Sequence, residues 1–140
     1  MVGTRSRAWV PPTSRSPKTV REAFGTIQKN WGFMKSTPET LQRLARTVPG
    51  TWVALTGKFK NATRLSWNSP SPAIVNLKKV YLVHPEENRN ISLAEAAALQ
   101  GFPSRYIWHG TESEIAQMLA DAVPVEFAEA LASSLIQDGR

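Results

Sequence analysis

The sequence predicts an α+β fold in which a small mixed sheet or irregular region is followed by C-terminal helices. Short runs rich in β-forming residues occupy the middle of the chain. Residues 84–140 instead carry helix-start signals and apolar residues spaced three and four apart. The length of 140 residues, or 15.5 kDa, allows one domain, or one domain with a small extension.

The N-terminal third is expected to contain an arm and two short helices. Residues 1–18 hold three of the ten prolines with Ser, Thr and Arg and show no apolar periodicity, which is typical of an extended arm. A helix is predicted from Thr19 to about Ile27, where apolar residues share one face. A second helix is predicted to start at Thr37-Pro38-Glu39, with a hydroxyl N-cap before a proline, and to end at Pro49-Gly50.

Three strand-like runs follow, at residues 51–56, 73–77 and 80–83. Each is short and contains β-branched or aromatic residues, as half-buried strands do. The segment between the first two runs is predicted to be a loop that mixes basic and aromatic side chains, namely Lys58, Phe59, Lys60, Arg64 and Trp67.

The C-terminal part is predicted to be helical. Ser92-Leu93-Ala94-Glu95 fits a capping box, and its helix is expected to end at Gly101. A second capping box is predicted at Thr111–Glu114. The last helix is expected to begin near Pro124 and to carry one apolar stripe, formed by Ala128, Leu131, Ala132, Leu135 and Ile136.

Charge divides the chain into two unlike halves. Residues 1–80 carry fourteen Lys and Arg and two acids, a net charge of +12, whereas residues 81–140 carry three Arg and nine acids, a net charge of −6. This asymmetry favours a polyanionic partner for the first half, and nucleic acid is the polyanion that distributed cations neutralise. A basic surface that is only solvated is the alternative.

Several classes of protein are excluded. The 140 residues contain no cysteine, which excludes disulfides, thiolate metal sites and a cysteine nucleophile within them. Two histidines, His84 and His109, cannot build a His-rich metal centre, so no metal site is expected. The longest apolar runs are four residues, against about 20 needed to cross a bilayer, and no signal peptide is visible. A soluble, intracellular protein without membrane association is expected.

One segment resembles a known family motif. Residues 84–103 read His-Pro-Glu-Glu-Asn-Arg-Asn-Ile-Ser-Leu-Ala-Glu-Ala-Ala-Ala-Leu-Gln-Gly-Phe-Pro. This run resembles motif IX of the DNA (cytosine-5) methyltransferases, Arg-x-Leu-Thr-x-Arg-Glu-x-x-x-Leu-Gln-x-Phe-Pro. Ala94 departs from it, because the family usually has Arg there. The positions in register are Arg89, Ile91, Ser92, Glu95, Leu99, Gln100, Phe102 and Pro103.

A second run resembles motif X of the same family. Residues 120–124, Ala-Asp-Ala-Val-Pro, are similar to Gly-Asn-Ala-Val-Pro before the family's final helix, with Ala120 and Asp121 as departures. Arg64-Leu65-x-Trp67 and Pro70-Ser71-Pro72 look like the segment that precedes motif IX in many target-recognition regions. The N-terminus resembles the tail of motif VIII in one of two registers, through Val2-Gly3-Thr4-Arg5 or through Arg5 and Arg7.

The resemblance implies three parts. They are a basic Pro/Ser-rich arm (1–18), a target-recognition-like DNA-binding region (19–83) and a helical region with motifs IX and X (84–140). The resemblance and the basic, aromatic composition of this region together indicate five candidate DNA contacts: Lys58, Lys60, Arg64, Lys78 and Lys79.

The resemblance also implies roles for the motif residues. Asp121 and Ala122 would lie beside S-adenosylmethionine in an assembled enzyme. The motif IX residues are expected to be structural and to hold the two parts of the fold together; they are Arg89, Ser92, Glu95, Gln100, Phe102 and Pro103.

The resemblance implies no catalytic residue in this chain. The family's nucleophile is the Cys of a Pro-Cys pair, and its cofactor loop is Phe-x-Gly-x-Gly; Phe24-Gly25 does not continue in that way. The chain is therefore expected to be a C-terminal fragment or subunit of a DNA (cytosine-5) methyltransferase, inactive alone. It would supply DNA target recognition and part of the S-adenosylmethionine site, and a partner chain would supply the Cys.

Double-stranded DNA and such a catalytic subunit are the expected partners, in a restriction-modification setting in the cytoplasm of a prokaryote or of a phage host. The alternatives are a stand-alone basic DNA-binding module and a decayed remnant without methyltransferase activity.

Overall fold

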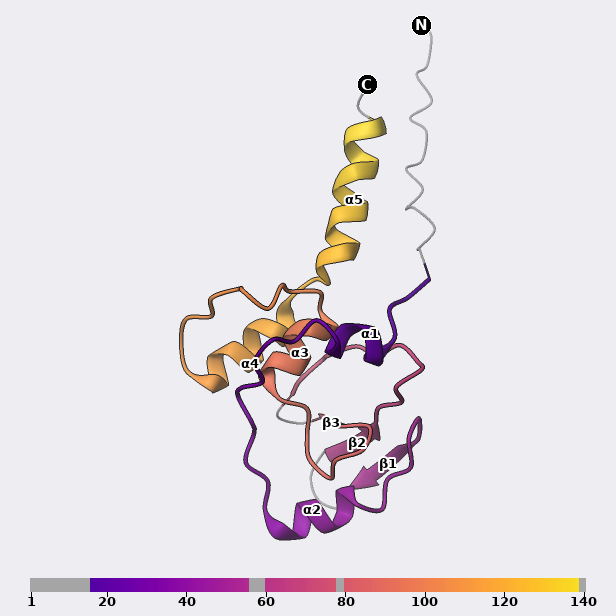
Figure 1. Ribbon diagram of the computed structural model, residues 1–140, viewed down its shortest axis with the longest axis vertical. Coiled ribbons are helices and arrows are strands. Elements are labelled where there is room, and N and C mark those ends of the chain that lie inside the picture. Colours follow the sequence, from indigo (N-terminus) through magenta and orange to yellow (C-terminus); the bar gives the residue numbers. More distant parts are fainter. Residues whose placement is uncertain (1–15, 56–59, 78–79, 139–140) are drawn as a thin grey trace, which may run out of the picture.

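The protein is represented by a computed structural model, which describes residues 16–55, 60–77 and 80–138. The helices are α1 (Val20–Phe24), α2 (Pro38–Leu44), α3 (Leu93–Leu99), α4 (Glu112–Asp121) and α5 (Val125–Asp138), and the strands are β1 (Trp52–Leu55), β2 (Lys60–Arg64) and β3 (Val80–Val83). A small sheet followed by C-terminal helices confirms the predicted α+β class. Figure 1 shows α1, α3 and α4 at the centre, the sheet and α2 on one side, and α5 projecting from the other.

The predicted helix starts are confirmed by side-chain hydrogen bonds. Thr19, Ser92 and Thr111 are the N-caps of α1, α3 and α4, and each forms a capping box with a Glu three residues later. Thr37 caps α2, with Pro38 in its first turn. Each cap oxygen accepts a backbone N–H that has no partner within its own helix, which is why these residues fix where the helices begin.

The three strands form one sheet in the order β1-β2-β3. β1 and β2 are antiparallel, with Trp52 opposite Thr63, whereas β2 and β3 are parallel, with Asn61 opposite Val80. The far edge of β3 is covered by the chain that follows it, because Ile91 N donates to Leu82 O at 2.8 Å. The segment between β3 and α3 is therefore bound to the sheet.

The sequence prediction of the strands is wrong in two places. Residues 60–64 were expected to be part of a loop but form the central strand β2. Residues 73–77 were expected to be a strand but are irregular, with Ile74 and Leu77 buried and Val75 69% exposed. Ala62 is the only apolar residue in the sequence of β2, so the strand lacks the apolar alternation that signals a strand.

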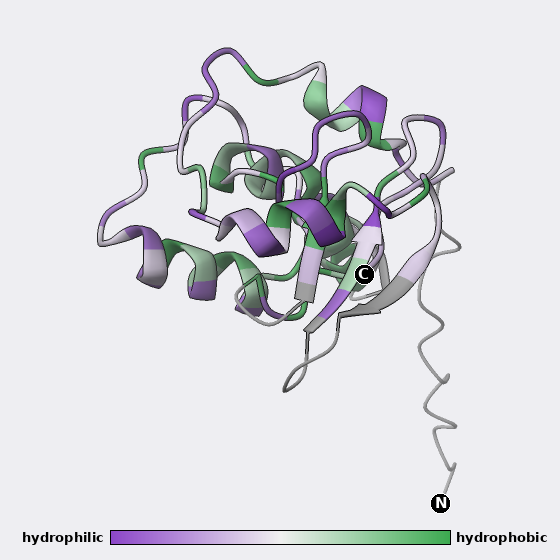
Figure 2. Cartoon of the chain, turned by 90° about the horizontal axis from the view of Figure 1, so that it is seen from below, coloured by the Kyte–Doolittle hydropathy of each residue, from purple (hydrophilic) through white to green (hydrophobic). Residues whose placement is uncertain are grey.

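The core lies between the sheet and the three central helices. Figure 2 shows hydrophobic stretches on the helices near the middle of the view and hydrophilic residues on many of the outer loops. α3 is buried over most of its length, from Leu93 to Ala98. The main core cluster joins residues of α1, β3, α3, α4 and the loops between them: Val20, Leu65, Ile74, Leu77, Leu82, Ile91, Leu93, Ala96, Ala97, Ile115, Ala116 and Leu119.

Arg64, which the sequence suggested as a DNA contact, lies in the interior and is 4% exposed. Its Nε, Nη1 and Nη2 atoms all donate hydrogen bonds within the protein. The acceptors, at 2.8–3.1 Å, are the main-chain oxygens of Leu44, Thr47, His84 and Glu87 and the side-chain oxygens of Thr47 and Asn88.

Arg64 therefore stabilises the interior of the protein and does not lie at the surface, where it could contact a phosphate. Its guanidinium joins β2 to the end of α2 and to the turn after β3. Burial lowers the pKa of Arg64 below its usual range. Arg suits this site because its planar fork reaches several carbonyl oxygens at once, whereas Lys offers one point of charge.

None of the helices in the described part of the chain is long and apolar enough to span a membrane.

Replacing Arg64 with Met should destabilise the protein strongly, because several buried carbonyl oxygens would lose their donor. A loss of about 3 kcal/mol in the free energy of unfolding is expected, measured by urea denaturation. The control is Arg46→Met at an exposed position, which should change stability by less than about 0.5 kcal/mol. Equal stability of the two variants would contradict the structural role of Arg64.

Candidate functional site

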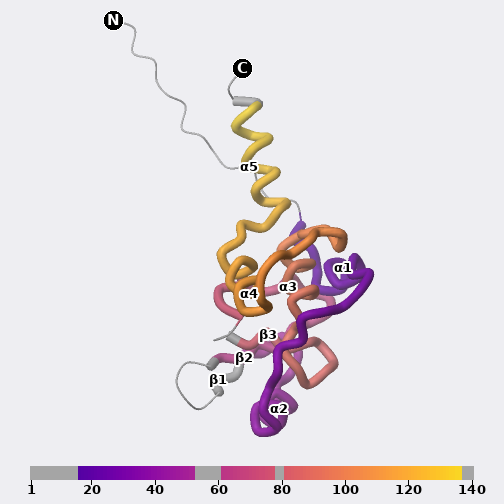
Figure 3. The backbone as a smooth tube through the Cα atoms, turned by 90° about the vertical axis from the view of Figure 1, so that its left-hand side faces the viewer, coloured from indigo at the N-terminus to yellow at the C-terminus, as the bar shows by residue number. Residues whose placement is uncertain are grey.

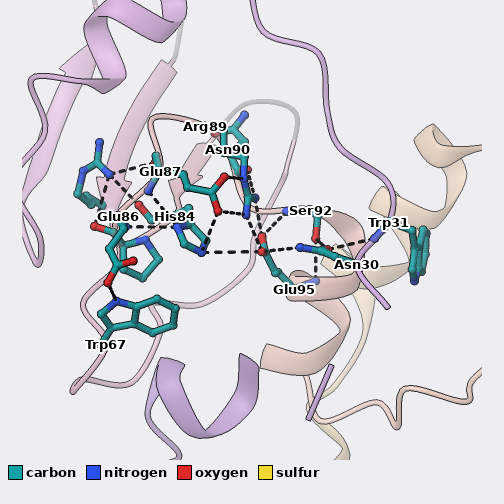
Figure 4. A network of polar contacts seen from close by, with 12 residues as sticks. Asn30, Trp31, Trp67, His84, Glu86, Glu87, Arg89, Asn90, Ser92 and Glu95 are labelled. Atoms are coloured by element: carbon teal, nitrogen blue, oxygen red, sulfur yellow. Dashed lines mark hydrogen bonds and ion pairs between the residues drawn. The ribbon is translucent and has the colours of Figure 1, made fainter. Parts of the chain in front are cut away.

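The first turn of α3 is completed by a segment far away in the sequence (Figure 4). The main-chain oxygens of Gly32 and Trp31 accept the amides of Leu93 and Ala94, at 3.0 and 3.3 Å. The capping box supplies partners for the amides on either side of this pair. A helix leaves its first amides without internal partners, so this segment and the capping box complete the N-terminus of α3.

The sequence assigned no role to this segment, which lies between two predicted helices. Asn30 Nδ2 donates to Glu95 Oε1 at 2.9 Å, and Asn30 Oδ1 accepts from the Ser92 hydroxyl. Gly32 has φ 72°, and a Cβ there would lie 2.7 Å from the Cβ of Leu93. Only glycine fits so close an approach. No periodic or capping signal announces these contacts, because they join parts of the chain more than sixty residues apart.

Glu95 and Arg89 form the ion pair at the centre of this network. Arg89 Nη1 donates to Glu95 Oε2 and Arg89 Nη2 to Glu95 Oε1, both at 2.8 Å. Arg89 Nε and Nη2 also bind the carboxylate of Glu87, at 2.8 and 3.0 Å. Its guanidinium carbon lies 5.1 Å from the centre of the Phe33 ring. The pair links the turn after β3 to the first turn of α3.

The carboxylate of Glu95 stays charged although the residue is only 2% exposed. Burial alone would raise the pKa of Glu95, but the hydrogen bonds from Arg89 and from the Ser92 amide outweigh it, and the pKa lies below its usual value. The hydrogen bonds to Glu95 raise the pKa of Arg89 further above its usual range. A buried charge is tolerated here because it is paired and hydrogen-bonded.

His84 lies beside this pair in its neutral form. Its Nδ1 accepts the amides of Glu86 and Glu87, at 3.3 and 3.0 Å, so the ring proton is on Nε2. Nε2 lies 4.0 Å from Glu95 Oε1. Burial and the nearby charge of Arg89 lower the pKa of His84. This arrangement makes His84 a hydrogen-bonded core residue.

The C-terminal part of motif IX contacts the helices that follow. Gln100 is 6% exposed and reaches the end of α4, where its side-chain amide donates to Leu119 O at 3.0 Å. The Phe102 ring packs edge-on against Tyr106 and Trp108. Pro103 O accepts the Tyr106 amide at 2.9 Å. These residues shape the loop between α3 and α4.

Ala94, where the family usually has Arg, is buried on the side of α3 that faces this loop. It lines a shallow hollow together with the rings of Trp31, Phe102, Tyr106 and Trp108. The departure from the motif therefore coincides with an aromatic-walled hollow.

Asp121 and Ala122, the expected cofactor neighbours, lie where α4 ends and the chain turns into α5. Asp121 is exposed and Ala122 is half-exposed. The Asp121 carboxylate accepts the Gln117 side-chain amide, with both oxygens at 3.0 Å. This short segment can form one accessible edge of a cofactor site. The hollow described above is lined by other residues.

The candidate DNA contacts other than Arg64 fall at one end of the sheet or outside the described part of the chain. Lys60 is the first residue of β2, while Lys58, Lys78 and Lys79 lie outside the described residues. β2 and β3 begin side by side, because they are parallel and Asn61 pairs with Val80. The sequence segments that carry these lysines therefore precede neighbouring strand starts.

Among the described helices, α5 packs least against the rest of the protein. It runs for 14 residues, and none of residues 125–136 is buried. Phe127, Leu135 and Ile136 are 54%, 59% and 65% exposed. In Figure 3, α5 stands away from the body of the protein. The apolar stripe that the sequence predicted is therefore present, and it is largely uncovered.

Lowering the pH should weaken the fold in two stages. The folded pKa of His84 lies below its ordinary 6.5, so the unfolded chain takes up the proton more readily and stability falls below about pH 6.5. The pKa of Glu95 lies below its ordinary 4.5, so its contribution is lost as the pH falls below 4.5 and through the folded value. Urea unfolding between about pH 7.5 and pH 3.5 measures both stages.

His84→Gln should remove the first stage, whose slope is at most about 1.4 kcal/mol per pH unit for one proton. His109→Gln, at an exposed loop position, is the control and should keep the wild-type slope. An unchanged slope in His84→Gln between about pH 7 and pH 5.5 would show that the surroundings of His84 do not disfavour its protonation.

Comparisons with known proteins show which family this chain resembles. The family model for the C-5 cytosine-specific DNA methylases matches residues 5–137. The chain is 30% identical over 123 residues to the type II methyltransferase M.Eco47II of Escherichia coli, which is 86% of this chain and 29% of that relative. It is 34% identical over 84 residues to M.PspPI of Psychrobacter, which is 58% of this chain and 20% of that relative.

A solved structure supports the same assignment. It is described as a DNA modification methyltransferase encoded within a prophage of E. coli, and it superposes with a TM-score of 0.61 at 27% identity. The match covers 77% of this chain and 28% of that one. The chain thus spans less than a third of the length of these relatives. Since the family model matches well over half of the 140 residues, the chain belongs to the family of C-5 cytosine-specific DNA methylases.

Proposed function

We propose that this chain works as the C-terminal part or subunit of a DNA (cytosine-5) methyltransferase, with α5 as the element that docks on a catalytic chain. The observation that carries the proposal is that the apolar face of α5 is exposed while the motif IX segment is buried in the core. Burial of a Leu, Ile or Phe side chain is worth about 1.5–3 kcal/mol, so a helix with several such side chains in water is expected to find a partner.

The charge of α5 limits which partner surfaces this helix can dock on. Among residues 125–138 there are two Glu, one Asp and no Lys or Arg. Glu126 pairs with Lys18 at the base of the helix, and Glu129 lies one turn further along. The partner surface is therefore an apolar groove with a neutral or basic rim, because an acidic rim would repel this helix.

The catalytic thiolate would lie outside these 140 residues, on the catalytic chain. Attack on C6 of cytosine needs a strong nucleophile, which in this family is a Cys, and these 140 residues contain none. S-adenosylmethionine supplies the methyl group when it is bound. The contribution of this chain is to hold the duplex while the target base is flipped out, and to offer the edge formed by Asp121 and Ala122.

DNA contact is assigned to the basic half of the chain. Its net charge of +12 would attract phosphates, and the lysine-bearing segments at 58–60 and 78–79 precede the adjacent starts of β2 and β3. Arg64 is excluded from this set, because its guanidinium is fully bonded inside the protein. Lys58, Lys60, Lys78 and Lys79 remain the proposed contacts.

The second candidate function is a stand-alone DNA-binding module. The observation that favours it is that the core from α1 to α4 forms within this chain, with α3 buried and both of its ends bonded. Such a module would bind DNA without any methyltransferase partner.

Activity should appear only on assembly. The isolated chain should transfer no methyl group from labelled S-adenosylmethionine to duplex DNA. Co-expression with a neighbouring chain that carries Pro-Cys and Phe-x-Gly-x-Gly should produce cytosine methylation, read by bisulfite sequencing. Leu135→Asp should lower assembly about 10-fold or more, because docking would bury an unpaired charge.

The matched control is Ser133→Asp, which adds the same charge about 200° around α5 from Leu135 and should leave assembly intact. Both positions are exposed, so neither variant should unfold the isolated chain. Transfer by the isolated chain, or equal loss with both variants, would refute docking through the apolar face. DNA binding without any methylation on co-expression would favour the stand-alone module.

DNA binding by the full chain should weaken steeply with salt. Each neutralised phosphate contributes a slope of about −0.9 in log affinity against log salt, so replacing Lys58, Lys60, Lys78 and Lys79 with Gln should reduce the slope by up to about 3.6. Arg105→Gln, an exposed cation in the acidic half, should leave the slope unchanged. A flat salt response in the wild type would count against nucleic acid as the partner.

A further inference from the structure

We infer that Gln100 is the positioning residue of the junction between α4 and α5, where Asp121 and Ala122 lie. The inference rests on the proposed function for its link to the cofactor, whereas the positioning itself can be tested without a partner.

The C-terminal cap of α3 fixes the direction of Gln100. Gly101 has φ 82°, in the left-handed region, and donates its amide to Ala98 O at 3.0 Å. Phe102 donates its amide to Ala97 O, also at 3.0 Å. This pair of bonds is a Schellman motif, which ends the helix sharply at Gln100. A Cβ on Gly101 would also lie 3.4 Å from Val125 Cβ, so the cap and the start of α5 are in contact.

Gln100 then makes three hydrogen bonds across the junction. Its Nε2 donates to Leu119 O at 3.0 Å and to Ala122 O at 3.4 Å. Its main-chain oxygen accepts the Val125 amide at 2.9 Å. The last carbonyl groups of a helix have no partner within it, so the Gln100 amide satisfies oxygens that α4 leaves open. Gln100 thus forms hydrogen bonds with the end of α4, with Ala122 between the two helices, and with the start of α5.

The Asp121 carboxylate is held separately. The Gln117 side-chain amide, one turn back on α4, donates to it, so the carboxylate lies along the surface of its own helix. The two glutamines therefore have different tasks: Gln100 sets the main chain of the junction, and Gln117 binds the Asp121 side chain. This arrangement explains how Asp can stand where the family's motif has Asn, because the edge is set through the main chain.

The side-chain amide is the required group at position 100. Met has a similar shape but cannot donate, so it would leave the oxygens of Leu119 and Ala122 without a partner. Glu has almost the same shape as Gln, but its carboxylate would face two carbonyl oxygens and repel them. If only the shape of the Gln100 side chain mattered, Gln100→Glu would resemble the wild type. If its N–H donor matters, both Gln100→Met and Gln100→Glu loosen the junction, and Gln100→Glu loosens it more.

Hydrogen exchange of the full isolated chain tests the positioning. In Gln100→Met, the amides of residues 120–128 should exchange about 10-fold faster, as expected when a buried hydrogen bond is lost, while Ile115 and Ala116 should keep wild-type rates. Gln117→Met, which removes only the contact with the Asp121 side chain, is the control and should leave the junction amides unchanged. Unchanged junction rates in Gln100→Met, or faster exchange throughout the chain, would overturn the positioning role.

The assembled enzyme tests the link to the cofactor. Gln100→Met should raise KM for S-adenosylmethionine about 10-fold and leave kcat within about 3-fold, because the binding edge moves while the reacting groups of the partner do not. A changed junction with an unchanged KM would overturn that link. Failure of the wild-type pair to methylate would refute the proposed function, and the exchange data would still decide the role of Gln100.

Discussion

The ion pair between the buried Glu95 and the half-buried Arg89 is the contact on which the rest of the fold depends. Glu95 serves three partners at once: the Ser92 amide in the capping box, the Asn30 side chain and the Arg89 guanidinium. Through these bonds one carboxylate fixes the start of α3, the 30–32 segment and the turn after β3. Removing Arg89 leaves the buried carboxylate of Glu95 without its charged partner, which costs about 3–5 kcal/mol. Without Glu95, Arg89 would keep its ion pair with Glu87. The structural role of Arg89 and Glu95 stays a prediction, and these contacts are the ones through which it would act.

α3 connects this ion pair to the other half of the protein. It is short and buried over most of its length, its N-terminus is bonded to the segment around Asn30, and its C-terminal Gln100 is bonded to the start of α5. The elements proposed to face DNA and the junction proposed to face S-adenosylmethionine are thus joined by one rigid helix. α5 continues from the junction with its apolar face uncovered, as expected of an element that packs on another chain.

Local signals in the sequence predicted the helices well, because each helix start depends on residues within one turn. The Thr19, Ser92 and Thr111 caps and the apolar stripe of α5 are of this kind. The central strand and the interior place of Arg64 depend instead on partners that are distant along the chain, and no local pattern encodes them. For the same reason the bonds of Asn30 to α3 were missed, although Asn30 completes the network around Glu95.

A double-mutant cycle on Arg89 and Glu95 tests the central claim most directly. The free energies of unfolding of Arg89→Met, Glu95→Gln and the double variant are compared with the wild type by urea denaturation. If the pair holds the fold together, the two effects are strongly non-additive, with a coupling energy of about 3 kcal/mol, and the double variant is little worse than Arg89→Met alone. Additive effects, with coupling below about 0.5 kcal/mol, would contradict the account.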